Sequence, residues 1–321
     1  MKLPIVFALT MLFGASTALA QNTPPVPGGD APTTQADAKA PASDMKITVL
    51  KVGENPAELR MKPVAGTDVT LTVTTKMSMT TKMGDNALPA QSIPTLVMTL
   101  KQSVESVDPD GTAHCKVTFT AFQVKQEAGD TPGIGDMIDK MMKGLINLSG
   151  DFTISDRGIS SPVNWVFGPD VAPMIRSQME SMSQSMDQFS LPLPKEAIGE
   201  GGQWKIVGQI DTQGIKLEQT RTVTLNKRNQ SILDLTIDVS QTAKPQDVSM
   251  PGGQKMHVDS MSATGTGQVT VDLAMLGATS GMSEVKSHSK MEIEAGPGGK
   301  QTLVQDASIT VKIDTAPSTS S

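Results

Sequence analysis

The feature that most constrains the fold is a strict two-residue alternation of apolar and polar side chains. It first appears in a run whose apolar members share one parity and are separated by threonine, lysine and serine: Val69, Leu71, Val73, Met77 and Met79. Successive side chains of a β-strand point to opposite faces, so this run predicts a long strand with one buried and one solvated face. The same period returns in segments that begin at Leu96, Cys115, Leu233, Val285 and Ala307. So many runs of this kind predict antiparallel sheet.

Turn and helix signals lie between these strands. The residues Asp108 to Gly111 separate two alternating runs and predict a hairpin, and the residues Gly296 to Gly299 predict a second one. Apolar residues at intervals of three and four predict amphipathic helices near 134–147 and over 171–189. The expected fold is therefore α+β and predominantly antiparallel β. Two similar β-rich halves, as curved sheets or a half-barrel, would flank two amphipathic helices.

The two ends of the chain differ from this pattern. Residues 1–20 carry Lys2, a short apolar run and small residues at Ala18 and Ala20, which predicts a signal peptide cleaved near Ala20. Residues 21–44 are rich in Pro, Ala and Thr and predict a disordered linker, and residues 316–321 predict a disordered tail. The first half is expected at 45–169, and the helix at 171–189 with the second half at 170–315. The mature protein is expected to be secreted or periplasmic, with no transmembrane anchor, because its apolar runs are too short to cross a bilayer.

Charge and cysteine content argue against a nucleic-acid partner and against stabilisation by an intrachain disulfide. Loss of Lys2 with the signal peptide leaves 26 basic against 33 acidic side chains and a net charge of about −7. An acidic chain without a basic block argues against nucleic acid as a partner. The single cysteine, Cys115, cannot form an intrachain disulfide, so stability must come from burial.

Several of these motifs together resemble a known family. They are the glycine turn at Gly66 before a long strand, the DPDG hairpin at 108–111, the LPLPKEAIGEGGQW stretch at 191–204 and the closing GxG strand at 265–267. The chain resembles a family of uncharacterised secreted bacterial proteins with a duplicated β-rich domain of unknown function, over roughly Leu59 to Ile313. The resemblance implies a fold and no activity.

The methionine-rich segments raise the question of a metal site. Thioether groups select Cu(I), but no histidine or thiolate lies near SQMESMSQSMDQF at 177–189, and methionine is a common filler of irregular cores. Core packing is therefore the preferred interpretation, and no cofactor or metal is expected. A curved sheet lined with methionine could also form an apolar groove for a lipid or for the side chains of a partner. The candidate residues for this groove are Met77, Met79, Met141, Met142, Met179, Met182, Met186 and Trp204.

The other reactive residues do not form a recognisable catalytic motif. His114 and Cys115 are neighbours on a predicted strand, so their side chains point to opposite faces, with Cys115 in the core and His114 in solvent. An enzyme would require a pocket in which His257 or His288 meets a carboxylate. The sequence therefore predicts a protein that is not an enzyme and that binds an apolar ligand or lipid between sheet and helices. The alternative is a structural or interaction module that binds another envelope protein.

Overall fold

Strands make up most of the computed structural model, which describes residues 45–168, 171, 175–176, 179, 183, 191–212, 214–249, 255–295 and 299–317. The first group of elements is β1 (Lys46–Lys51), β2 (Glu54–Ala57), β3 (Asp68–Met83), β4 (Asn86–Ala87), β5 (Gln91–Val107), β6 (Ala113–Lys125), α2 (Ile134–Met142), the 3-10 helix η1 (Lys143–Leu145), β7 (Ser149–Ile154) and β8 (Asn164–Val166). The second group is β9 (Ile198–Glu200), β10 (Gln203–Thr212), β11 (Ile215–Asn229), β12 (Ile232–Ala243), β13 (Gln246–Ser249), β14 (Lys255–Asp272), β15 (Gly277–Ala295) and β16 (Gly299–Pro317).

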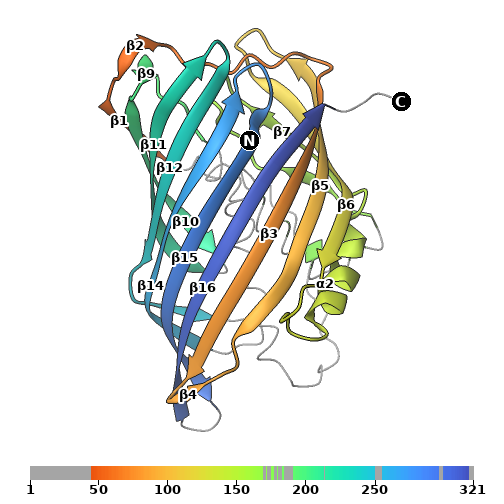
Figure 1. The fold of residues 1–321 in the computed structure, drawn as a ribbon, viewed down its shortest axis with the longest axis vertical. Coiled ribbons are helices and arrows are strands. Elements are labelled where there is room, and N and C mark those ends of the chain that lie inside the picture. Colours follow the sequence, from red (N-terminus) through yellow and green to blue (C-terminus); the bar gives the residue numbers. More distant parts are fainter. Residues whose placement is uncertain are drawn as a thin grey trace, which may run out of the picture.

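One antiparallel sheet of 14 strands contains all the long strands (Figure 1). Its order is β1-β10-β11-β12-β14-β15-β16-β3-β5-β6-β7-β8, with β4 paired to β3 and β13 to β14. The last strand, β16, pairs along its length with β3, the first long strand, so segments far apart in sequence lie side by side. The sheet remains open, with β1 and β8 as its two edges, and β2 and β9 form a separate two-stranded sheet.

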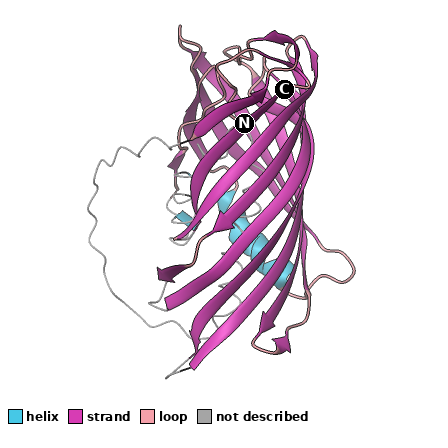
Figure 2. Ribbon diagram, turned by 90° about the vertical axis from the view of Figure 1, so that its left-hand side faces the viewer, coloured by secondary structure: helices cyan, strands magenta, loops and turns pink. Residues whose placement is uncertain are grey.

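The large sheet is strongly curved (Figure 2), and α2 packs against β5 and β6. Buried residues of all the long strands belong to a single hydrophobic cluster, which also includes Ile134, Ile138 and Met142 of α2 and Leu145 of η1. We call the face of the sheet that carries this cluster the inner face. Close contact between β14 and β15 requires glycine in β14, because a Cβ atom at Gly265 would lie 2.5 Å from the carbonyl oxygen of Glu284 in β15.

The structure confirms the strand pattern. The alternating run from Val69 is β3, whose apolar residues are buried on one parity, and the Asp108 to Gly111 turn joins β5 to β6. Alternation therefore predicted which side chains face the core, although several strands run longer than their apolar cores. β16, for example, continues through Ala316 and Pro317, two residues that had been assigned to the tail.

Other predictions are met in part or lie outside the described residues. The helix expected near 134–147 is present, shortened to α2 and followed by η1. Of the helix expected over 171–189, the described residues Ile175, Arg176, Met179 and Ser183 are helical and Val171 lies in a bend. The other residues of that segment lie outside the described part of the chain, as do residues 1–44 and 296–298 of the expected Gly296 turn. Two similar halves and a duplication are not confirmed: strands of both segments share one sheet, and β1 lies at its far edge beside β10.

Candidate functional site

The inner face carries a lateral row of small and polar residues that crosses seven strands. In an antiparallel sheet, residues directly opposite one another on neighbouring strands share a face and touch. Following these pairs from β11 to β5 joins residues that are scattered along the sequence. We call this row the polar belt; its members are Gln219, Gln241, Ala263, Ser287, Ala307, Met79 and Gln91.

Three glutamines of the polar belt bury polar atoms that are unsatisfied. Gln219 and Gln241 are opposite each other on β11 and β12 and are only 3% and 2% exposed. The Nε2 atom of Gln219 and the Oε1 atoms of Gln241 and Gln91 are buried without a hydrogen-bond partner among the described residues. A buried polar group that lacks a partner loses its hydration without compensation, so these atoms are costly unless something else meets them.

Arg221 brings a positive charge to the same place. It lies two residues after Gln219 on β11, is 8% exposed, and sits opposite Ile206 of β10 and Val239 of β12. Its Nη2 atom is 3.8 Å from Sδ of Met45. Burial lowers the pKa of Arg221 to about 10, because removing a guanidinium from water disfavours its charged form.

Apolar side chains lie on both sides of the polar belt. The row that contains Arg221 continues through Val285, Ile309 and Met77, whereas the row on the other side passes from Leu217 and Met261 to the buried polar residues Ser289 and Gln305. A surface that combines polar atoms with apolar side chains matches an amphipathic molecule better than a purely apolar one.

A small pocket opens at one end of the inner face, next to the turn between β14 and β15. Its cavity volume is only about 10 Å³, roughly the room that one water molecule needs. Its lining is mainly apolar, with Val69, Leu71 and Leu276, and it includes Gln102.

The residues predicted to form an apolar groove are only partly brought together. Met77 and Met79 lie on the inner face of β3, and Met79 belongs to the polar belt. Met142 and Met179 are buried in the hydrophobic cluster, and Trp204 is fully buried on β10. The backbone of Met141 is helical within α2, while Met182 and Met186 lie outside the described residues.

Sequence reasoning missed the polar belt, although part of its signal was visible. On the apolar parity of β11, Leu217 and Val223 enclose Gln219 and Arg221, so the alternation is interrupted by two polar residues in succession. The opposition of Gln219 to Gln241 could not be predicted, because it depends on the register of β11 and β12.

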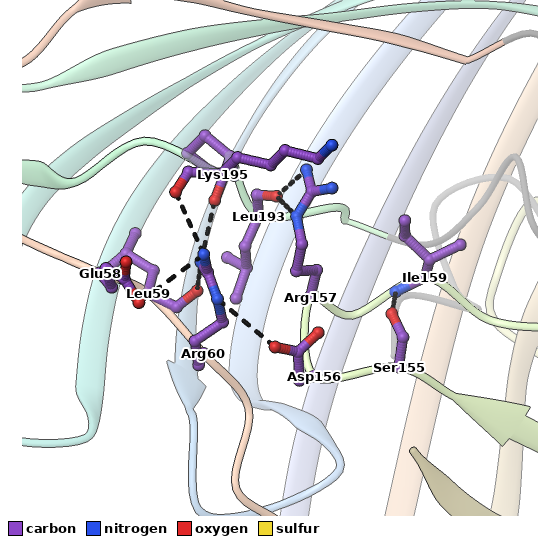
Figure 3. Close-up of polar contacts among 10 residues, drawn as sticks. Glu58, Leu59, Arg60, Ser155, Asp156, Arg157, Ile159, Leu193 and Lys195 are labelled. Atoms are coloured by element: carbon purple, nitrogen blue, oxygen red, sulfur yellow. Dashed lines mark hydrogen bonds and ion pairs between the residues drawn. The ribbon is translucent and has the colours of Figure 1, made fainter. Parts of the chain in front are cut away.

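A second polar cluster holds the proline-rich segment that precedes β9 (Figure 3). Both Nε and Nη2 of Arg157 donate to the carbonyl oxygen of Leu193, at 2.9 and 2.6 Å. Arg60 donates to the carbonyl oxygens of Pro194 and Lys195, and its Nε atom lies 3.4 Å from the carboxylate of Asp156. Burial, and then the charge of Arg60, lower the pKa of Arg157.

Trp204 completes this set of contacts. Its indole Nε1 donates to the carbonyl oxygen of Pro192 at 3.2 Å, so four consecutive carbonyl groups, 192 to 195, each accept a side-chain hydrogen bond. Pro192 and Pro194 have no N–H group, so this segment cannot form a regular sheet ladder. Because the two prolines are buried, side-chain donors satisfy the carbonyl groups of the segment instead. This cluster therefore has an evident structural role.

The histidines and the cysteine lie as the strand pattern predicts. Cys115 is 2% exposed in the core, where burial raises the pKa of its thiol to about 12, and His114 is exposed beside Asp108. His257 lies 2.6 Å from Asp247, and His288 lies 2.7 Å from Asp306. Both histidines therefore meet a carboxylate, but their side chains are 38% and 52% exposed, and the pocket described above is lined by other residues.

In the described part of the chain, no helix has the length and apolar character that a membrane span requires. Among the same residues, no group of three or more His, Cys, Asp or Glu side chains is arranged to hold a metal ion.

Comparison with known proteins gives one result. Residues 176–275 match the sequence profile of a family described as "Family of unknown function (DUF6263)". The match begins before the proline-rich segment and ends in the turn after β14, so it includes Gln219, Arg221 and Gln241. No curated protein matches the chain.

Proposed function

We propose that this protein is a non-enzymatic, secreted or periplasmic protein that binds an apolar ligand or lipid against the inner face of its curved sheet. The observation that carries the proposal is the amphipathic character of that face. Polar atoms of Gln219, Gln241 and Gln91 are buried there without partners in the described structure, beside the apolar row of Val285, Ile309 and Met77. A purely structural core gains nothing from such groups, whereas a bound lipid with a polar end would satisfy them.

The shape of the sheet supports the same proposal. The single sheet of 14 strands stays open, with β1 and β8 as its two edges, so the proposed route of an elongated ligand to the inner face lies between these edges.

Native mass spectrometry tests the proposal directly. The protein would be purified from the envelope of its own host, and the same preparation would be denatured, extracted with organic solvent and refolded as the control. We expect an added mass of one lipid-sized molecule on the native sample and a bare chain after extraction. A bare chain in both samples would refute lipid binding, and the mass of the bare chain would also show whether cleavage occurs after Ala20.

A second candidate function is an interaction module for another envelope protein. The observation that favours it is an exposed apolar residue at each edge of the sheet, since Leu50 of β1 is 52% exposed and Val166 of β8 is 62% exposed. Sheet edges are common sites of strand addition by a partner. A photo-crosslinking residue at Val166, compared with one at Lys286 on the outer face, should capture a defined partner in the native cell; equal labelling at both positions would count against this function.

A further inference from the structure

A methionine lies beside the β10 end of the row that forms the polar belt. This row continues past Gln219 to Gly208 of β10. Met45 comes immediately before β1, and its Cγ atom is 3.9 Å from the position that a Cβ atom on Gly208 would occupy. Its sulfur atom accepts a hydrogen bond from Nη2 of Arg221 at 3.8 Å. A half-buried thioether is therefore in contact with a buried guanidinium.

The contact between Met45 and Arg221 is one that a chemical change can strengthen. A thioether sulfur is a weak hydrogen-bond acceptor. Oxidation to a sulfoxide adds an oxygen atom and makes the side chain polar. Hydrogen bonds from an ionised donor are about twice as strong as neutral ones, and the exclusion of water strengthens them further. An oxygen on this sulfur would therefore improve an acceptor that Arg221 already contacts.

Access to solvent distinguishes Met45 from another thioether that accepts a hydrogen bond. Nε2 of Gln305 donates to the sulfur of Met79, but Met79 is only 5% exposed on the inner face. Met45 is half-buried and precedes β1, an edge strand of the sheet, so a small oxidant can reach it. Met137 of α2 provides a comparison, because it is exposed but receives no side-chain hydrogen bond from the described residues.

We propose that Met45 is a site of reversible oxidation by hydroperoxides, at which the sulfoxide oxygen accepts a hydrogen bond from Arg221. The sulfur attacks one oxygen of hydrogen peroxide, the O–O bond breaks and an S–O bond forms. The thioether loses two electrons to the peroxide, and the departing hydroxide takes the proton of the transferred hydroxyl group to become water. A methionine sulfoxide reductase reverses the change with two electrons from thiols. This site goes beyond the proposed function and does not depend on it.

Oxidation at this position stabilises the edge of the sheet. Met45 precedes β1, and Arg221 lies on β11, with β10 between these two strands. The sulfoxide and the guanidinium meet only in the folded protein, so their hydrogen bond favours the folded state. This effect is the opposite of the usual one in a core, where a sulfoxide places a polar group among apolar side chains.

Mild oxidation of the mature protein, followed by proteolysis and mass spectrometry, locates the modified methionines. The folded protein is treated with dilute hydrogen peroxide, and the excess is removed before digestion. We expect one added oxygen atom on Met45 and on the exposed Met137, while Met79 stays unmodified. An intact Met45 under conditions that fully oxidise Met137 would overturn the proposal.

Urea denaturation followed by circular dichroism measures the effect of the added oxygen. Each oxidised protein is compared with its own reduced sample, and the matched control is Met45→Leu, which retains every other methionine. We expect oxidation to lower the equilibrium constant for unfolding about tenfold relative to its effect on Met45→Leu, the order of difference that one charged hydrogen bond provides. Treatment with a methionine sulfoxide reductase and a dithiol should remove this difference.

Two further variants test the donor and the position. Arg221→Leu retains Met45 but has no guanidinium, so oxidation should no longer stabilise it, whereas Met137→Leu should show the same gain as the unaltered protein. An equal effect of oxidation on the unaltered protein and on Met45→Leu refutes the proposal, as does a gain that persists in Arg221→Leu. The comparison with Met45→Leu decides the matter even if Arg221→Leu does not fold.

Discussion

Replacing Gln219 by leucine should raise the free energy of unfolding of the ligand-free protein. Nε2 of Gln219 is buried with no hydrogen-bond partner in the described structure, and such a group costs about 1–3 kcal/mol of desolvation. Leucine is close to glutamine in size and carries no polar atom. The pairing of β11 with β10 and β12 uses main-chain atoms, so it is retained. We therefore expect a gain of about 1–3 kcal/mol, and a similar gain for Gln241→Leu.

Urea denaturation followed by tryptophan fluorescence measures this change. The chain contains two tryptophans and no tyrosine, so the signal comes from Trp165 and Trp204 alone, and both are buried. The protein must first be freed of bound lipid, because a ligand that binds only the folded state adds its own stabilisation. Gln268→Leu, on the exposed outer face, is the control and should change stability by less than about 0.5 kcal/mol.

The opposite result would refute the reasoning behind the proposed function. If Gln219→Leu and Gln241→Leu each lower the free energy of unfolding by more than about 1 kcal/mol, the two amides are satisfied within the protein and contribute to its stability. They would then be structural residues, and the polar belt would lose its claim to a ligand. If both variants gain stability and also lose ligand affinity, the polar atoms are present for binding.

Three further changes test other parts of the structure. Cys115 should react with a thiol reagent only on unfolding, and rapid labelling of the native protein would contradict its burial. Because burial raises the pKa of the folded-state thiol to about 12, its contribution to stability should be full below about pH 9 and should fall as the pH rises toward 12. Gly199→Ala should destabilise the protein by about 3 kcal/mol or more in urea, because its Cβ would lie 1.7 Å from a carbonyl oxygen of β2, whereas Gly144→Ala, with no atom within 4 Å of its Cβ, should be neutral. Arg157→Met should lower the free energy of unfolding by about 1–3 kcal/mol, because the carbonyl oxygen of Leu193 loses both of its donors. The control is Lys143→Met, which removes an exposed ion pair; if Arg157→Met costs no more than this control, Arg157 does not stabilise the proline-rich segment.

The strands and their buried faces could be predicted from the sequence because a period of two depends only on local geometry. Val69 to Met79 and Leu233 to Ile237 were assigned to the core side by parity alone, and their burial confirms this. The pairing of strands depends on contacts between distant segments, and alternation carries no information on which strand is the neighbour. For this reason the junction of β16 with β3 and the place of β1 beside β10 emerged only from the structure.

The same limit explains why the candidate site was predicted only in part. Methionine attracted attention because thioether chemistry is distinctive, and Met77, Met79, Met142 and Met179 did prove to be buried. A glutamine on a strand is ordinarily interpreted as a solvent-facing residue. Whether Gln219 lies in the core depends on the strand parity around it, and whether it meets Gln241 depends on strand register, which single-sequence reasoning does not supply.

The small residues of the polar belt and its unsatisfied glutamines have a common physical consequence. Ala263, Ser287 and Ala307 occupy the central strands of the belt, and the glutamines with unsatisfied atoms lie toward its two sides. Filling the centre with leucine and replacing the glutamines would give a tighter and more stable core by ordinary packing rules. A sheet that retains neither advantage on its inner face is better suited to holding a molecule than to maximum stability, as the proposed binding of an amphipathic ligand requires.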